Sequence, residues 1–247
     1  PYLAASAAKQ AGIPSAVVAN LTWTDVLGCF SDTESPRHRA ILGTVRDAYG
    51  DADVGLRIAP SLPMMVFKQV HDIGPIAEPA PPRRQELRSY LKLRENERLV
   101  LVGFGGIPLK ALPWHAMEKL QDHHFIVDGA PEAASPRVHP VSSLPFSFKT
   151  VLASVDVVMT KPGYGTIVEA VALCLPVVYV RRYNFADEGP LVDFLIRYGR
   201  GRELSREDFF SGNWRTALDA VTASKAQSPG PPVTGAADAA RFLGQYL

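Results

Sequence analysis

The apolar residues of this chain come in short unbroken runs, and no other feature constrains the fold as strongly. Residues 98–104 ("RLVLVGF"), 155–159 ("VDVVM") and 176–182 ("PVVYVRR") show no alternation of apolar and polar positions. A strand buried on both faces produces such a run, whereas a strand with one exposed face alternates. Segments with helical spacing separate the runs. We therefore predict an α/β fold in which helices cover both faces of a parallel sheet.

The expected elements follow from this rhythm and from the positions of proline and glycine. Strands are expected at residues 15–19, 98–104, 124–129, 137–141, 155–159 and 176–182, with a further short strand soon after residue 66. Helices are expected within residues 1–10, 21–30, 36–49, 84–91, 112–121, 149–154, 164–173, 187–199 and 236–247.

A proline-rich passage at residues 75–82 is typical of an interdomain linker. It divides the chain into residues 1–75, residues 76–232 and a terminal helix at residues 233–247. An α/β domain usually opens on a buried strand, but this chain opens within a helix. We expect residues 1–75 to be the remnant of an amino-terminal domain whose earlier strands are absent.

Composition excludes several classes of function. Apolar residues make up 47% of the 247 residues, charged residues 21%, and the net charge is +1. This balance is ordinary for a globular protein and gives no electrostatic reason to expect nucleic acid as a partner. No apolar run approaches the ~20 residues of a transmembrane helix. Cys29 and Cys174 stand among apolar residues, so we expect two buried free thiols and a cytoplasmic protein.

The stretch "TKPGYGTIVEA", residues 160–170, places a glycine-rich turn between a buried strand and a helix. Such a turn exposes backbone N–H groups at the positive end of the helix, which favours an anion such as phosphate. We expect Gly163 and Gly165 to adopt positive φ, and Thr166 to cap the helix or bind a phosphate oxygen. Glu169 has the acceptors that suit the hydroxyls of a ribose. A tight packing turn with a Thr166–Glu169 capping box explains the same residues.

A second glycine-rich turn, "GFGGIP", follows the strand at residues 98–104. The carboxyl ends of neighbouring parallel strands meet at one edge of a sheet, so the two turns are expected to line one crevice.

The run "VDVVMTKPGYGTIVEAVALCLPVVYVRR" resembles the donor-binding segment of GT-B type glycosyltransferases. It is most similar to the transferase that adds N-acetylglucosamine to make lipid II, and to uncharacterised bacterial proteins that share "KPGYGT". The resemblance extends through "LVLVGFGG", "NFADEGPL" and "AGIPSAVVANLTW", and so covers nearly the whole chain. It implies two Rossmann-like domains, the amino-terminal one incomplete here, and a nucleotide-sugar held mainly by the carboxyl-terminal domain.

The resemblance also implies a set of donor-binding residues. Gly163, Tyr164, Gly165 and Thr166 would lie under the diphosphate, with Glu169 on the ribose. The backbone at Val141 and Ser142 would face the base, Gly105 and Gly106 would line the phosphate side, and Asp187 and Glu188 would contact the donor sugar. Arg182 and Arg181 could offset the diphosphate charge, although an exposed position at a strand end explains both equally well. Lys161 is a weaker candidate of the same kind.

The activity implied is transfer of a sugar from a nucleoside diphosphate, preferably UDP, to an unknown acceptor hydroxyl. No cofactor or metal is expected, and "DAD" at residues 51–53 is interpreted as a solvated turn. None of the six histidines is a convincing catalytic base, so the catalytic residues are unknown. Two alternatives remain: a nucleotide-sugar hydrolase or epimerase, and a binding module without catalysis.

Overall fold

The computed structural model describes residues 2–32, 34–105, 112–130, 135–183 and 185–246. The chain divides into two compact units, each described by itself below. The first contains residues 1–76, 184–191 and 231–247, and the second contains residues 77–183 and 192–230.

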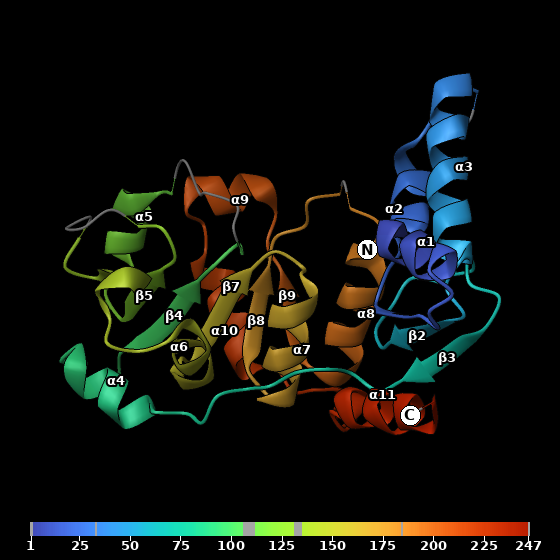
Figure 1. The fold of residues 1–247 in the computed structure, drawn as a ribbon. Coiled ribbons are helices and arrows are strands. Elements are labelled where there is room, and N and C mark those ends of the chain that lie inside the picture. Colours follow the sequence, from blue (N-terminus) through green and yellow to red (C-terminus); the bar gives the residue numbers. More distant parts are fainter. Residues whose placement is uncertain (1, 33, 106–111, 131–134, 184, 247) are drawn as a thin grey trace. The chain divides into compact units, whose positions relative to one another are not determined.

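The second unit is built on a parallel sheet of six strands (Figure 1). The strands are β4 (Arg98–Val102), β5 (His123–Val127), β6 (Val138–Pro140), β7 (Val157–Thr160), β8 (Pro176–Tyr179) and β9 (Arg200–Glu203). They lie in the order β6-β5-β4-β7-β8-β9, and every pair is parallel. Numbered along the unit, this order is 3-2-1-4-5-6, the arrangement of doubly wound α/β folds.

The unbroken apolar runs are explained by burial on both faces of this sheet. One face carries Val100, Val102, Met159 and Val178, which share a core with residues of α5, α9 and α10. Residues at alternating positions, such as Leu101, point to the opposite face and are equally buried. The helices of this unit are α4 (Arg84–Tyr90), α5 (Trp114–Lys119), η1 (Val141–Ser143), α6 (Phe148–Ser154), α7 (Tyr164–Ala172), α9 (Arg206–Ser211) and α10 (Arg215–Ala223); α8 (Glu188–Tyr198) contains residues of both units.

The first unit contains a smaller parallel sheet in the order β1-β2-β3. Its elements are α1 (Tyr2–Gln10), β1 (Ala16–Ala19), α2 (Trp23–Phe30), α3 (Pro36–Gly50), β2 (Val54–Ile58), β3 (Val70–Ile73), α11 (Gly235–Leu243) and η2 (Gly244–Tyr246). The carboxyl-terminal helix α11 packs against β3, and the Gly74 amide donates to the Asp238 carboxylate at 3.1 Å. The first and last described segments therefore belong to the same unit.

The α/β class and the parallel sheets are confirmed, but four elements were not predicted from the sequence: β2, β9, α9 and α10. β9 has the sequence "RGRE", which contains no apolar side chain, and its position is given by pairing with β8. α9 and α10 contribute Phe209 and the fully buried Trp214, whose indole Nε1 donates to the Phe209 carbonyl at 2.9 Å.

Residues 51–53 form a turn at the end of α3, as expected, and Asp53 is exposed, but both aspartates also make hydrogen bonds. The Asp51 carboxylate accepts hydrogen bonds from Ser6 and Lys9 of α1, and the Asp53 carboxylate accepts the Ser15 amide at 2.7 Å. Both aspartates therefore attach the amino-terminal helix and strand to the end of α3.

The expectation of two buried cysteines is wrong, since Cys29 and Cys174 are free but exposed. Cys174 ends α7 in the left-handed conformation, with φ of +55°. Its amide donates to the Val171 carbonyl and the Leu175 amide donates to the Ala170 carbonyl, which is the pattern of a Schellman motif. The role of residue 174 is to end a helix, and glycine adopts this conformation at lower cost.

Candidate functional site

The two glycine-rich turns lie side by side at the point where the sheet reverses its winding. β4 and β7 pair with each other, with Val102 opposite Met159, although they are separated in sequence by two other strands. In doubly wound folds, ligands bind at this switch point, outside the carboxyl ends of the strands. The prediction that the two turns share one crevice edge is therefore supported by the strand order.

The backbone of the turn after β4 favours a glycine. Gly105 has φ of +54°, and a Cβ at this residue would lie 3.2 Å from Nζ of Lys161, which comes from the turn after β7. The two turns are thus close enough for a side chain of one to contact the backbone of the other. Gly106, the next residue predicted to line the site, lies outside the described residues.

The turn after β7 differs from expectation in its backbone conformation. Gly163 is extended, with φ of −142°, and Gly165 belongs to the first turn of α7, so neither adopts positive φ. Among the described residues, a Cβ at Gly165 would meet no atom within 4 Å, and a Cβ at Gly163 would meet only Lys161, at 3.6 Å. Neither backbone strain nor packing accounts for these glycines. They leave open space at the start of α7.

Helix α7 also begins without a side-chain cap. Gly163 occupies the N-cap position, and Thr166 is the third residue of the helix, so the predicted Thr166 cap and Thr166–Glu169 capping box are wrong. The preceding helix, α6, is capped by the Ser147 hydroxyl. A helix start that lacks a side-chain acceptor and is lined by glycines offers its N–H groups and its dipole to an anion.

Arg182 reaches the glycine-rich turn from the end of the neighbouring strand β8. Its guanidinium donates to the Pro162 carbonyl at 3.3 Å, so a cation lies directly beside the start of α7. The adjacent Arg181 instead stacks over the Tyr183 ring, at 5.0 Å from the ring centroid.

Glu169 lies on the second turn of α7, with a side chain that is only 13% exposed. Burial raises its pKa, and the Lys149 ammonium, 3.7 Å from Oε1, acts in the opposite direction. Lys149 is the charged group of this region that sequence reasoning missed. The only sequence signal was its place in the first turn of a predicted helix, which does not indicate what it faces.

Val141 and Ser142, predicted to face a base, form η1 directly after β6 and so lie at the carboxyl end of a strand of the same sheet. Ser142 is exposed and Val141 is partly buried. A further acidic residue at this edge, Asp128, follows β5 and is exposed; it was not singled out from the sequence.

Comparison with known proteins identifies the fold. No family model matches the chain. The calicheamicin glycosyltransferase CalG4 superimposes with a TM-score of 0.64 at 17% identity, over 97% of this chain and 69% of that one. The glycotransferase of kitacinnamycin superimposes with a TM-score of 0.60 at 18% identity, over 99% of this chain and 70% of that one. UDP-glucose: anthocyanidin 3-O-glucosyltransferase, solved in complex with UDP, superimposes with a TM-score of 0.59 at 15% identity, over 92% of this chain and 65% of that one. This is the GT-B fold.

One curated relative in sequence carries a different activity in its name. The chain is 28% identical to L-arabinokinase of Arabidopsis thaliana over 226 residues, which are 90% of this chain and 22% of that protein. The chain thus spans about a fifth of the length of this relative. The particular likeness to the lipid-II-forming enzyme stays a prediction.

Two of the residues predicted to bind the donor sugar belong to the first unit, whereas the glycine-rich turns belong to the second. Asp187 and Glu188 precede and begin α8 and are grouped with residues 1–76. Both carboxylates are buried, at 6% and 2% exposure, and both residues have interaction partners. Their contact with a donor sugar stays a prediction.

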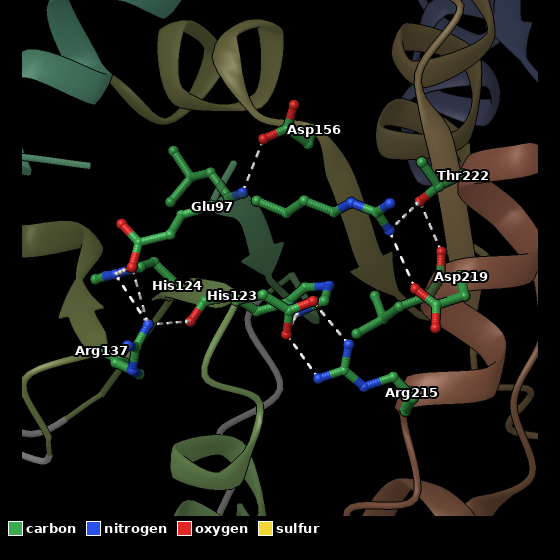
Figure 2. Close-up of polar contacts among 12 residues, drawn as sticks. Glu97, His123, His124, Arg137, Asp156, Arg215, Asp219 and Thr222 are labelled. Atoms are coloured by element: carbon green, nitrogen blue, oxygen red, sulfur yellow. Dashed lines mark hydrogen bonds and ion pairs between the residues drawn. The ribbon is translucent and has the colours of Figure 1, made fainter. Parts of the chain in front are cut away.

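Three of the histidines, His123, His124 and His139, lie at or near the amino ends of β5 and β6. Figure 2 shows His123 and His124 with their polar contacts. His123 is fully buried, with Nδ1 3.0 Å from the Asp122 carboxylate. The rings of His124 and His139 are stacked, with nitrogens 3.1 Å apart, and the Glu97 carboxylate lies 3.5 Å from His124. Burial lowers the pKa of each of the three, that of His139 to about 4. This network lies at the end of the strands opposite the glycine turns, and its structural role stays a prediction.

No helix in the part of the chain that the structure describes combines the length and the apolar character needed to cross a membrane.

Proposed function

We propose that this chain supplies the nucleotide-sugar site of a glycosyltransferase that takes its sugar from a nucleoside diphosphate, preferably UDP. One observation carries the proposal. At the switch point of the sheet, α7 begins with two glycines that neither the backbone nor internal packing requires, and it begins without a side-chain cap. A diphosphate fits that space and accepts hydrogen bonds from the exposed amides.

The neighbouring groups support a nucleotide rather than a free phosphate. Arg182 adds a cation beside the turn, and Glu169 offers a half-buried carboxylate about one turn further along α7. In this arrangement the diphosphate lies over Gly163, Tyr164, Gly165 and Thr166, while the ribose hydroxyls donate to Glu169. The Val141–Ser142 backbone then faces the base.

The chemistry proposed is substitution at the anomeric carbon. The acceptor hydroxyl forms a new C–O bond to that carbon, the bond to the diphosphate oxygen breaks, and the nucleoside diphosphate leaves with the electron pair. The start of α7 and Arg182 stabilise the charge that develops on the leaving group. A base must take the acceptor proton. None of the residues discussed above is assigned this role, and the acceptor is equally unassigned.

The relation to L-arabinokinase favours a second candidate. A segment 28% identical to this chain forms about a fifth of a protein named for sugar phosphorylation rather than glycosyl transfer. The second candidate is therefore a nucleotide-sugar-binding module within a chain whose activity lies elsewhere. The two free thiols are compatible with a reducing compartment, which supports the cytoplasm as the proposed location.

Isothermal titration of the chain with UDP, GDP and TDP tests the proposal. We expect one nucleotide to bind, and Glu169→Ala to weaken it, while Glu207→Ala, an exposed glutamate on α9, leaves the affinity unchanged. Failure of all three nucleotides to bind would overturn the proposal. Product analysis with a UDP-sugar separates the remaining functions. A glycosylated acceptor indicates a transferase, release of free sugar indicates a hydrolase, and an isomerised sugar nucleotide indicates an epimerase. Binding of the UDP-sugar without turnover indicates a non-catalytic binding module.

A further inference from the structure

Lys149 lies between two carboxylates that come from different segments of the second unit. It belongs to the first turn of α6, whose N-cap is Ser147. Its ammonium is 3.7 Å from Oε1 of Glu169 on α7. It also donates to the Glu78 backbone carbonyl at 3.2 Å and lies 3.5 Å from the Glu78 carboxylate, in the segment before α4.

The two carboxylates differ strongly in exposure, which decides where the charge of Lys149 acts. The Glu78 side chain is 93% exposed and the Glu169 side chain 13%, with Lys149 itself at 48%. Water screens the pair with Glu78, so its carboxylate contributes little. The attraction to the half-buried Glu169 is screened less. The Glu78 carbonyl accepts a hydrogen bond that holds the ammonium in place.

The charge state of Glu169 decides whether its carboxyl group can accept hydrogen bonds from both ribose hydroxyls. An ionised carboxylate accepts hydrogen bonds from both hydroxyls of a vicinal diol, whereas a protonated carboxyl loses part of this capacity. Burial works against ionisation at this position, and so does the negative charge of Glu78, while Lys149 favours it. Among the described residues, Lys149 and Glu78 are the charged groups that shift the pKa of Glu169.

The geometry points to Lys149 as a positioning residue of the nucleotide site, which holds the Glu169 carboxylate in the orientation and acceptor state that a ribose diol needs. This inference rests on the proposed function. Lys149 also follows η1 by only a few residues. One short segment therefore contains both the backbone expected to face the base and the lysine that positions Glu169 for the ribose.

The test is UDP affinity between pH 5 and pH 8 for the wild type, Lys149→Met and Lys149→Arg, with the exposed Lys225→Met as the matched control. A shift of one pKa unit changes the ionised fraction about tenfold below the pKa. We expect Lys149→Met to weaken UDP binding several-fold more at pH 5 than at pH 8, because the raised pKa of Glu169 is then no longer opposed by the ammonium. Lys149→Arg should restore the wild-type profile, and Lys225→Met should not change it.

Two further measurements separate this inference from its alternatives. With 2′,3′-dideoxy-UDP, which lacks the diol, Lys149→Met and wild type should bind equally at every pH. A ¹³C NMR titration of the Glu169 carboxyl in the ligand-free protein should show a higher pKa in Lys149→Met. An equal loss of UDP affinity at all pH values, or no loss, would overturn the role of Lys149 while leaving the nucleotide site intact. A wild type that binds no nucleotide would overturn both.

Discussion

Gly165→Ala is expected to make the protein more stable and its nucleotide binding weaker. Gly165 is the second residue of α7, it lacks the positive φ that would demand glycine, and a Cβ there meets no described atom within 4 Å. Alanine therefore fits the ligand-free structure without strain. It also removes conformational freedom from the unfolded chain.

The two magnitudes follow from this geometry. Replacing glycine by alanine within a helix is worth about 0.5–1 kcal/mol, which raises Tm by about 1–4 °C for a chain of this size. The added methyl group occupies space that the proposal assigns to the diphosphate. A loss of about tenfold in UDP affinity, or about 1.4 kcal/mol, is expected from this obstruction.

Thermal unfolding and UDP titration of one preparation measure both effects. Gly43→Ala is the matched control, since Gly43 lies within α3 and a Cβ there also meets nothing within 4 Å. It should raise stability without changing affinity. Unchanged UDP affinity in a stabilised Gly165→Ala variant would show that the ligand does not approach the start of α7. A loss of stability would contradict the helical conformation of Gly165.

Three other predictions concern separate parts of the chain. Glu169→Ala should weaken the binding free energy of UDP by about 1–3 kcal/mol, measured by calorimetric titration. A folded variant that binds UDP as tightly as wild type would refute the ribose contact. Cys174→Gly and Lys92→Gly should each raise the free energy of unfolding in urea by about 0.5–1 kcal/mol, because both residues end helices with positive φ; a decrease would argue against this conformation. The pKa of His139 is lowered to about 4, below its unfolded value, so its stabilising contribution is present above pH 6.5 and is lost towards pH 4. Wild type should lose about 2 kcal/mol more than His139→Gln between pH 8 and pH 5, and equal losses would assign the pH dependence elsewhere.

The order of strands and helices was largely predictable because it depends on local periodicity. Buried runs such as residues 99–102 and 157–160 are recognisable in the sequence, since every position is apolar or small. β9 was missed because "RGRE" is a polar edge strand. Only the pairing with β8, and the close packing of Gly201 against Leu195, reveal why this segment is extended.

The candidate site was predictable in its location but not in its conformation. A glycine-rich turn between a buried strand and a helix pointed to residues 163–166, and the strand order places that turn at the switch point. The positive φ expected for Gly163 and Gly165 was wrong, because glycine is also found where space must be left open, and a sequence does not distinguish the two causes. The positive φ instead occurs at Gly105 and Cys174.

The sequence alone therefore determined the α/β class, the parallel arrangement of buried strands and the position of the glycine-rich turns. These depend on side-chain period and backbone freedom, which are properties of short segments. Only the tertiary structure decided that the turns after β4 and β7 are neighbours, that Arg182 reaches Pro162, and that Lys149 faces Glu169. Such contacts join residues distant along the chain, and their charges act on one another only where the fold brings them together.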